Sequence, residues 1–306
     1  MSDLGLWSVP LAMLGGAIRV STPFLFVSLG ECVTEKSGRI NLGLEGTLVF
    51  GAMAGYGGSL MSGSSWLGVL IAGVAGVLFG LLHGLLCSLS KVNDIAVGIA
   101  LMLLGTGLAF FFGKPLIQPA APMLPAIDFG AWSDVPQLRA ALRVSPLFLI
   151  GILIAVALAF TFKYTRVGLV LRMVGDSADA ARAMGYDILR VRVLATAFGG
   201  FMAGVAGAYL SLFYPGSWNE GISSGQGLIA VALVIFARWK PLACLGAALI
   251  FGGAGALGPA LQSVGVTSGY YLFYAAPYVL TLAILIVTSS PKGALEGAPR
   301  ELSITK

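Results

Sequence analysis

Polar side chains placed inside long apolar runs are the residues of this sequence most able to do chemistry. Asn41 and Glu45 lie four residues apart, at the start of an apolar run that continues through Phe50. A helix brings residues four apart onto one face, and polar groups this far into a membrane helix should face protein or water. Arg19 interrupts another apolar run and likewise needs a partner or a wet cavity. We therefore predict that these side chains join helices or line a polar path.

Aromatic side chains could border the same path, although packing is the commoner role of aromatics at helical spacing. The residues that we predict for the path are Arg19, Asn41, Glu45, Phe50, Tyr209 and Trp218. Four further charges in segment 30–46 either belong to this constellation or are solvated charges of a surface turn. They are Glu31, Glu35, Lys36 and Arg39. The single histidine, His83, has no second ligand nearby, so we predict a packed core residue and no metal site.

The segment from Asp176 to Gly185 has the signals of a short helix with a defined start and stop. Asp176 or Ser177 can cap its N-terminus, and Gly185 follows a run of good helix formers and suits the left-handed position after a helix. A free helix this short is unstable in water, and its mostly alanine apolar residues give it little affinity for lipid. We therefore predict that it docks on a partner protein. The docking residues would be Asp176, Ser177, Asp179, Ala180, Ala181, Arg182, Met184 and Gly185.

The elements that must position these groups are membrane helices. Only 10% of the 306 residues are charged, against about 25% in an ordinary soluble domain, which argues against a soluble enzyme, a disordered protein and a nucleic-acid binder. We predict an all-α polytopic transmembrane bundle of about nine spans (eight to ten) that forms one domain over residues 1–306. The run 222–237 is short enough to be a half-helix. The predicted spans are 9–30, 40–60, 66–90, 94–113, 146–162, 193–213, 222–237, 241–260 and 270–289.

Lysine and arginine side chains predict how these spans are oriented. With segment 163–192 in the cytoplasm, nine spans leave only Lys114, Arg139 and Arg143 on the outer side. This agrees with the positive-inside rule, so the net charge of +5 reflects topology and not nucleic-acid affinity. The same arrangement places the N-terminus outside and the C-terminus in the cytoplasm. It makes the proline-rich segment 114–145 an extracytoplasmic loop with one short surface helix.

Four separated segments resemble one known family. Residues 179–185, DAARAMG, resemble the E-A-A-x-x-x-G loop of the permeases of ATP-binding-cassette (ABC) importers, with Asp179 in place of glutamate. Residues 30–46 resemble the GE…ERSGV.NLGLEG stretch of the permease family that includes ribose and branched-chain amino-acid importers. Residues 227–241 and 276–280 are similar to the shorter permease of bacterial nucleoside-type importers. Lys36 and Arg39 stand where that pattern has arginine and a small apolar residue.

The resemblance implies half of the transmembrane path of an ATP-driven importer in the bacterial inner membrane. Implied partners are a cytoplasmic ABC ATPase, a second permease subunit (a non-identical paralogue by the family pattern), an extracytoplasmic solute-binding protein and membrane lipid. ATP would be bound by the ATPase, so this chain would hold no cofactor and would not be an enzyme. The cargo would be a nucleoside or purine-type compound, with a sugar or another small solute as the alternative. Segment 176–185 would be the coupling helix.

Two other classes compete with this interpretation. A secondary carrier or channel that works alone would need no partner for the helix at 176–185. A membrane-embedded enzyme would need a nucleophile or an acid–base cluster, and the spans offer no His, Ser and Asp group at one depth. The sequence also has no G-x-x-x-x-G-K-[ST] motif, so we expect no phosphate-binding loop in this chain.

Overall fold

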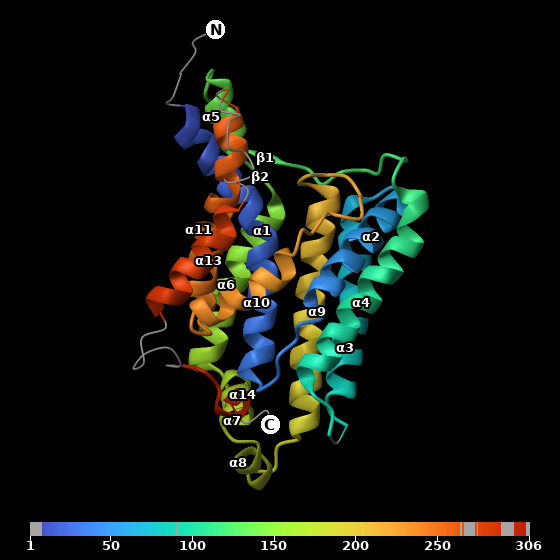
Figure 1. The fold of residues 1–306 in the computed structure, drawn as a ribbon, viewed down its shortest axis with the longest axis vertical. Helices are drawn as coiled ribbons and strands as arrows, with labels where there is room; N and C mark the ends of the chain where they lie inside the picture. The colour runs from blue at the N-terminus through green and yellow to red at the C-terminus, as the bar shows by residue number, and fades with distance from the viewer. Residues whose placement is uncertain are drawn as a thin grey trace.

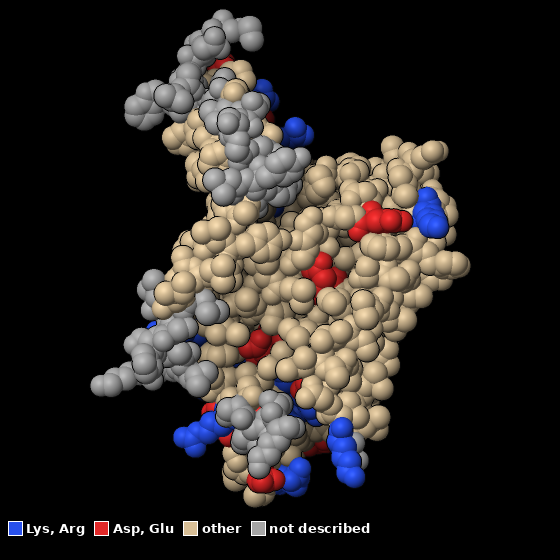
Figure 2. Space-filling model, in the orientation of Figure 1, with Lys and Arg blue, Asp and Glu red and all other residues tan. Residues whose placement is uncertain are grey.

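The computed structural model describes residues 8–89, 91–263, 265, 273, 275–288 and 297–303, and most of these are helical (Figure 1). Six helices are long and apolar enough to cross a membrane, which confirms an all-α polytopic fold. They are α1 (Ser8–Lys36), α3 (Ser65–Leu86), α4 (Asp94–Gly113), α6 (Pro146–Tyr164), α9 (Ile188–Leu212) and α11 (Pro241–Gln262). On the face drawn in Figure 2, lysine and arginine side chains gather toward the two ends of the molecule.

Three further helices fall within predicted spans. Helix α2 (Leu44–Ser62) has 19 residues but is rich in glycine and is buried along most of its length. Helix α10 (Gln226–Phe236) has 11 residues, about 16 Å of helix, against a hydrocarbon core of about 30 Å. It is therefore a half-helix. Helix α13 (Ala276–Thr288) covers the described part of the predicted span 270–289, of which residues 270–272, 274 and 289 lie outside the described residues.

Small residues let two pairs of long helices approach closely. Helix α3 packs on α9, and a Cβ atom on Gly76 would lie 2.0 Å from the carbonyl oxygen of Gly200. Helix α11 packs on α1 in the same way, because a Cβ atom on Gly252 would lie 2.5 Å from the carbonyl oxygen of Ala17. Such contacts are typical of membrane helices that pack through small residues. The regularly spaced small residues of these helices thus serve close helix packing.

These two pairs reveal an inverted arrangement of the bundle. One half of the bundle contains α1, α2 and α3, and the other contains α9, α10 and α11. The first helix of each half packs on the third helix of the other: α1 on α11, and α9 on α3. In Figure 1, α1 runs downward from the end that carries the N-terminus, whereas α9 rises from the opposite end. The second helix of each half departs from an ordinary span. Helix α2 carries Glu45 in its first turn, and α10 is short and begins at Gln226. Transporters with inverted halves place their solute sites at such broken helices.

The connection 114–145 contains more structure than a loop with one helix. Its elements are η2 (Lys114–Leu116), β1 (Ile127–Asp128), α5 (Pro136–Ala141) and β2 (Arg143–Val144). Strands β1 and β2 pair antiparallel, and Arg139 of α5 forms an ion pair with Asp128 at 2.6 Å. That hydrogen bond from Arg139 lowers the pKa of Asp128. Helix α5 lies against α1, where a Cβ atom on Gly15 would be 2.6 Å from the Cα atom of Ala141.

The connection 163–192 holds two helices and not the single one predicted. The additional helix is α7 (Arg166–Asp176), followed by α8 (Ala178–Ala183). Helix α7 buries Leu171 and Val174 on one face and packs on α6 and α1. These tertiary contacts stabilise it. With the C-terminal α14 (Arg300–Ser303), α7 and α8 form the lower end of the molecule in Figure 1.

Candidate functional site

The half-helix α10 begins on the carboxylate of Glu45. One oxygen of Glu45 accepts hydrogen bonds from the Ser223 hydroxyl at 2.6 Å and from the Gly225 amide at 3.1 Å, and the other accepts from the Gly227 amide at 2.6 Å. Free amides and the helix dipole make a helix N-terminus a favourable place for a negative charge. The position of Gly227 requires glycine, because a Cβ atom there would lie 2.6 Å from the carboxylate oxygen. Glu45 therefore joins α2 to α10.

The link between α1 and α2 is held by the remaining polar groups of segment 30–46. The side chain of Glu31 accepts a hydrogen bond from the Asn41 amide at 2.8 Å, and the Asn41 side chain accepts one from the Gly43 amide at 2.9 Å. Glu31 is fully buried, and Glu35 is 2% exposed and accepts a hydrogen bond from the indole of Trp239. The alternative of solvated turn charges is therefore wrong for both glutamates, because tertiary packing covers them.

The two basic residues of that segment also have partners. Arg39 forms an ion pair with Asp94 at 2.5 Å, and the side chains are 15% and 4% exposed. Lys36 donates a hydrogen bond to the carbonyl of Gly297 at 2.9 Å and lies over the ring of Trp239. These charges connect α1 and its following turn to α4, to the start of α11 and to the C-terminal segment.

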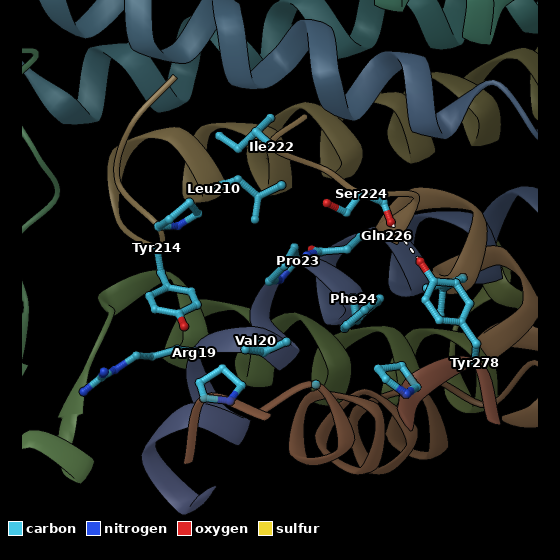
Figure 3. Close-up of a pocket in the computed structure, with 15 residues that line it drawn as sticks. Arg19, Val20, Pro23, Phe24, Leu210, Tyr214, Ile222, Ser224, Gln226 and Tyr278 are labelled. Atoms are coloured by element: carbon cyan, nitrogen blue, oxygen red, sulfur yellow. Dashed lines mark hydrogen bonds between the residues drawn. The ribbon is translucent and has the colours of Figure 1, made fainter. Parts of the chain in front are cut away.

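A cavity of about 330 Å³ lies beside the start of α10. Side chains of α1, α9, α11, α13 and the connection 213–225 enclose it together with α10 (Figure 3). Its polar lining includes Ser224 and Gln226, and the side-chain oxygen of Gln226 is buried with no hydrogen-bond partner among the described residues. Its aromatic lining is Phe24, Tyr214 and Tyr278. Its size and its few polar groups fit the usual dimensions of a small-molecule site.

Arg19 lies at the edge of this cavity, and both its side chain and its backbone carbonyl form hydrogen bonds. Its guanidinium donates a hydrogen bond to the carbonyl of Ala140, and in Figure 3 it points out of the cavity toward that connection. Its own carbonyl accepts a hydrogen bond from the hydroxyl of Tyr209 at 3.0 Å. Arg19 and Tyr214 also line two further cavities of about 350 and 300 Å³ beside the connection 114–145. Arg19 and Glu45 thus bind different partners, and they do not pair with each other.

The predicted aromatic path residues make packing contacts. Phe50 packs on Phe79 with ring centroids 5.1 Å apart. Tyr209 is 1% exposed, and Trp218 is 2% exposed and donates a hydrogen bond to the carbonyl of Gly113 at 2.9 Å. None of the three lines the 330 Å³ cavity. Their role in a path stays a prediction.

Among the residues lining this cavity, sequence reasoning predicted only Arg19 and missed, among others, four polar or aromatic residues. They are Tyr214, Ser224, Gln226 and Tyr278. Part of the signal was available, because Gln226 is a single polar side chain at the start of the apolar run 226–236, directly after Gly225. Gly225 has φ +79°, so the chain turns there into α10. The position of Tyr278 relative to these residues depends on the packing of α13, and its hydroxyl donates to the Ser224 carbonyl at 3.1 Å.

The predicted docking helix is present as α8, and its ends are as expected. The Ser177 side chain caps it by accepting a hydrogen bond from the Ala180 amide at 3.3 Å, and Gly185 follows it with φ +84°. Asp176 ends α7, and Ala181 is the buried residue of α8. The solvent-facing side includes Asp179, Ala180, Arg182 and Met184. Helix α8 lies at the lower tip of the molecule in Figure 1. The exposed Met184 that follows it is suited to a protein contact.

Comparison with known proteins decides the class. The family described as "Branched-chain amino acid transport system / permease component" matches residues 12–289. The chain belongs to this permease family. It is 35% identical over 80% of its length to the "Putative glucose ABC transporter permease protein TsgC13" of Haloferax volcanii, covering 76% of that protein. It is 31% identical to the guanosine ABC transporter permease NupQ of Bacillus subtilis and 28% identical to the nucleoside ABC transporter permease NupC of Lactococcus lactis, in each case over 87% of this chain and 88% of the relative.

The family assignment removes the two competing classes. This permease is a membrane transport component and not an enzyme, and it is the permease subunit of an ABC importer. Its polytopic helical fold agrees with that role. The secondary carrier or channel that works alone is therefore excluded for this chain.

Proposed function

We propose that this permease forms half of the translocation path for a nucleoside or purine-type compound. The observation that carries the proposal is the 330 Å³ cavity at the start of the half-helix α10, with the unpartnered oxygen of Gln226 in its wall. A planar base can stack on aromatic rings such as Tyr214 and Tyr278, and its amino group can donate to Gln226. Relatives named for guanosine and nucleosides support this cargo, and the relative named for glucose keeps a sugar as the alternative.

The proposed topology has nine crossings in the bacterial inner membrane. Two of them are broken: residues 37–62, in which a non-helical link precedes α2, and residues 213–236, in which a non-helical link precedes α10. The other seven are α1, α3, α4, α6, α9, α11 and α13. This places the N-terminus outside and α8 with the described C-terminal segment in the cytoplasm. The location of α8 and α14 at one end of Figure 1, opposite the start of α1, supports this orientation.

In this proposal α8 is the coupling helix and sits in a groove of a cytoplasmic ABC ATPase. A second permease subunit completes the path, and an extracytoplasmic binding protein delivers the solute. ATP drives transport because the ATPase binds it with unequal affinity in the inward- and outward-facing states. Arg19 and Tyr214 line the 330 Å³ cavity and both cavities beside the connection 114–145. In this proposal they form the constriction that a solute passes on entry.

The test is ATP-dependent uptake by the complete transporter in proteoliposomes. Radiolabelled guanosine and glucose are offered to the binding protein, and Gln226→Ala is compared with wild type. One lost hydrogen bond is worth about 1 kcal/mol, so half-saturation for guanosine should rise about fivefold. An Asn219→Ala variant, at an exposed position in the same connection, is the control and should leave uptake unchanged. Uptake of glucose alone would select the sugar alternative. If Gln226→Ala takes up guanosine with the half-saturation of wild type, the cavity is refuted as the path.

A further inference from the structure

The C-terminal segment 297–303 lies against the cytoplasmic end of the bundle, and Glu301 in it bonds to two other segments. One carboxylate oxygen of Glu301 accepts a hydrogen bond at 3.0 Å from the amide of Ala178, the first residue of α8. The other accepts a hydrogen bond from the guanidinium of Arg192 in α9 at 3.1 Å. The side chains of Arg192 and Glu301 are 13% and 22% exposed, so this ion pair is shielded from water and is stronger than an ordinary surface pair.

Arg192 extends this contact to the end of α1. Its Nε atom donates a hydrogen bond at 3.1 Å to the carbonyl of Ser37, in the turn that follows α1. The chain then runs through Asn41, whose amide bonds to Glu31, to Glu45 and the start of α10. Polar contacts at both ends, joined by the covalent chain from Ser37 to Glu45, therefore lead from α8 to the half-helix beside the 330 Å³ cavity.

The joint between these segments is tightly packed. Gly38 has φ +83°, and a Cβ atom there would lie 2.9 Å from the Cβ atom of Glu301 and 3.1 Å from the guanidinium of Arg192. A Cβ atom on Gly175, at the end of α7, would lie 2.2 Å from the carbonyl oxygen of Lys36. Closely packed contacts of this kind transmit displacement, because they cannot absorb it by compression.

The rest of α8 is far less constrained. Side chains on its outer side are solvent-exposed, with Asp179 at 93%, Arg182 at 69% and Met184 at 71%. No atom lies near the place where a Cβ on Gly185 would be. The first turn of α8 is thus held through Glu301, while its outer side is open to a partner.

We propose that Glu301 is a positioning residue for ATP coupling, which links α8 to the turn after α1. A displacement of α8 by the ATPase then moves Glu301, Arg192 and the turn at Ser37 together, and reaches Glu45 and α10. This inference rests on the proposed role of α8 as the coupling helix. It assigns to the C-terminal segment a part in transport that is separate from binding the solute.

The test measures solute imported per ATP hydrolysed by the complete transporter in proteoliposomes. Glu301→Ala should leave the ATPase bound and hydrolysing ATP, while the transport-to-ATP ratio falls about tenfold. Glu301→Gln keeps an oxygen for the Ala178 amide but loses the ion pair, so its ratio should lie between those of Glu301→Ala and wild type. Arg192→Gln should lower the ratio as Glu301→Gln does, and the double variant should add little. Glu220→Gln, at an exposed position on the opposite side, is the control.

The outcomes separate this inference from the proposed function. If Glu301 only stabilises the fold, uptake and ATP hydrolysis will fall in proportion to the amount of assembled transporter, and the ratio will stay at the wild-type value. That result overturns the inference, as does strict additivity of the two single variants. If Glu301→Ala does not assemble, Glu301→Gln and Arg192→Gln decide by the same ratio. Failure of the wild type to couple uptake to ATP would instead refute the proposed function.

Discussion

Replacing Glu45 should damage both the fold and transport, because one carboxylate holds the start of α10. It accepts three hydrogen bonds, from Ser223, Gly225 and Gly227, and it is 8% exposed. Hydrogen bonds to a charged group contribute about 1.5–3 kcal/mol each, but their partners regain some of this where water can enter. Glu45→Ala should therefore destabilise the protein by about 3–5 kcal/mol, somewhat less than the sum of three such hydrogen bonds.

Glu45→Gln separates the charge from the shape of the side chain. The amide oxygen can still accept from Ser223 and Gly225, but the amide nitrogen would face the donor of Gly227. One hydrogen bond and the charge at the helix N-terminus are lost, for a cost of about 2 kcal/mol. The ranking should be Glu45→Ala below Glu45→Gln below wild type, both in midpoint of thermal unfolding in detergent and in ATP-dependent uptake.

The control for this series must be an exposed glutamate. Glu35 does not qualify, because it is 2% exposed and bonded to Trp239, so its replacement should also be harmful. Glu220→Gln is suitable because Glu220 is solvent-exposed, and it should match wild type. If Glu45→Ala unfolds at the wild-type temperature and supports wild-type uptake, the role of Glu45 in holding α10 is refuted.

Two further predictions concern glycines. Gly185→Pro should abolish ATP-driven uptake and lower co-purification of the ATPase without preventing membrane insertion, because proline cannot adopt the φ of +84° that ends α8; normal uptake by this variant would remove α8 from coupling. Gly76→Ala should lower the free energy of unfolding by about 1–3 kcal/mol through overpacking against α9. Gly246→Ala is the matched helix control, because its Cβ would meet no atom within 4 Å, and equal unfolding midpoints for the two variants would contradict the close packing of α3 on α9.

Local patterns in the sequence were sufficient to predict the long apolar helices and the ends of α8. Long apolar runs predict membrane helices because the bilayer requires about 20 apolar residues and internally satisfied backbone groups. Ser177 and Gly185 predict the bounds of α8 because capping and a left-handed φ act within one turn of chain. Helix α7 was missed although local signals were present: Thr165 caps its N-terminus, and its buried residues Gly168, Leu171 and Val174 recur at helical spacing.

The sequence by itself determined that this protein is a bundle of membrane helices with a short capped helix between residues 176 and 185. Only the tertiary structure decided what its few polar groups do. Glu45 bonds to Ser223, 178 residues away, and Glu301 bonds to Ala178, 123 residues away. The cavity at Gln226 is walled by five helices. The physical reason is the sequence separation of the interacting residues. Helix formation depends on neighbours within a turn, whereas the hydrogen-bond donors of a buried carboxylate come from segments that only the tertiary packing brings close to it.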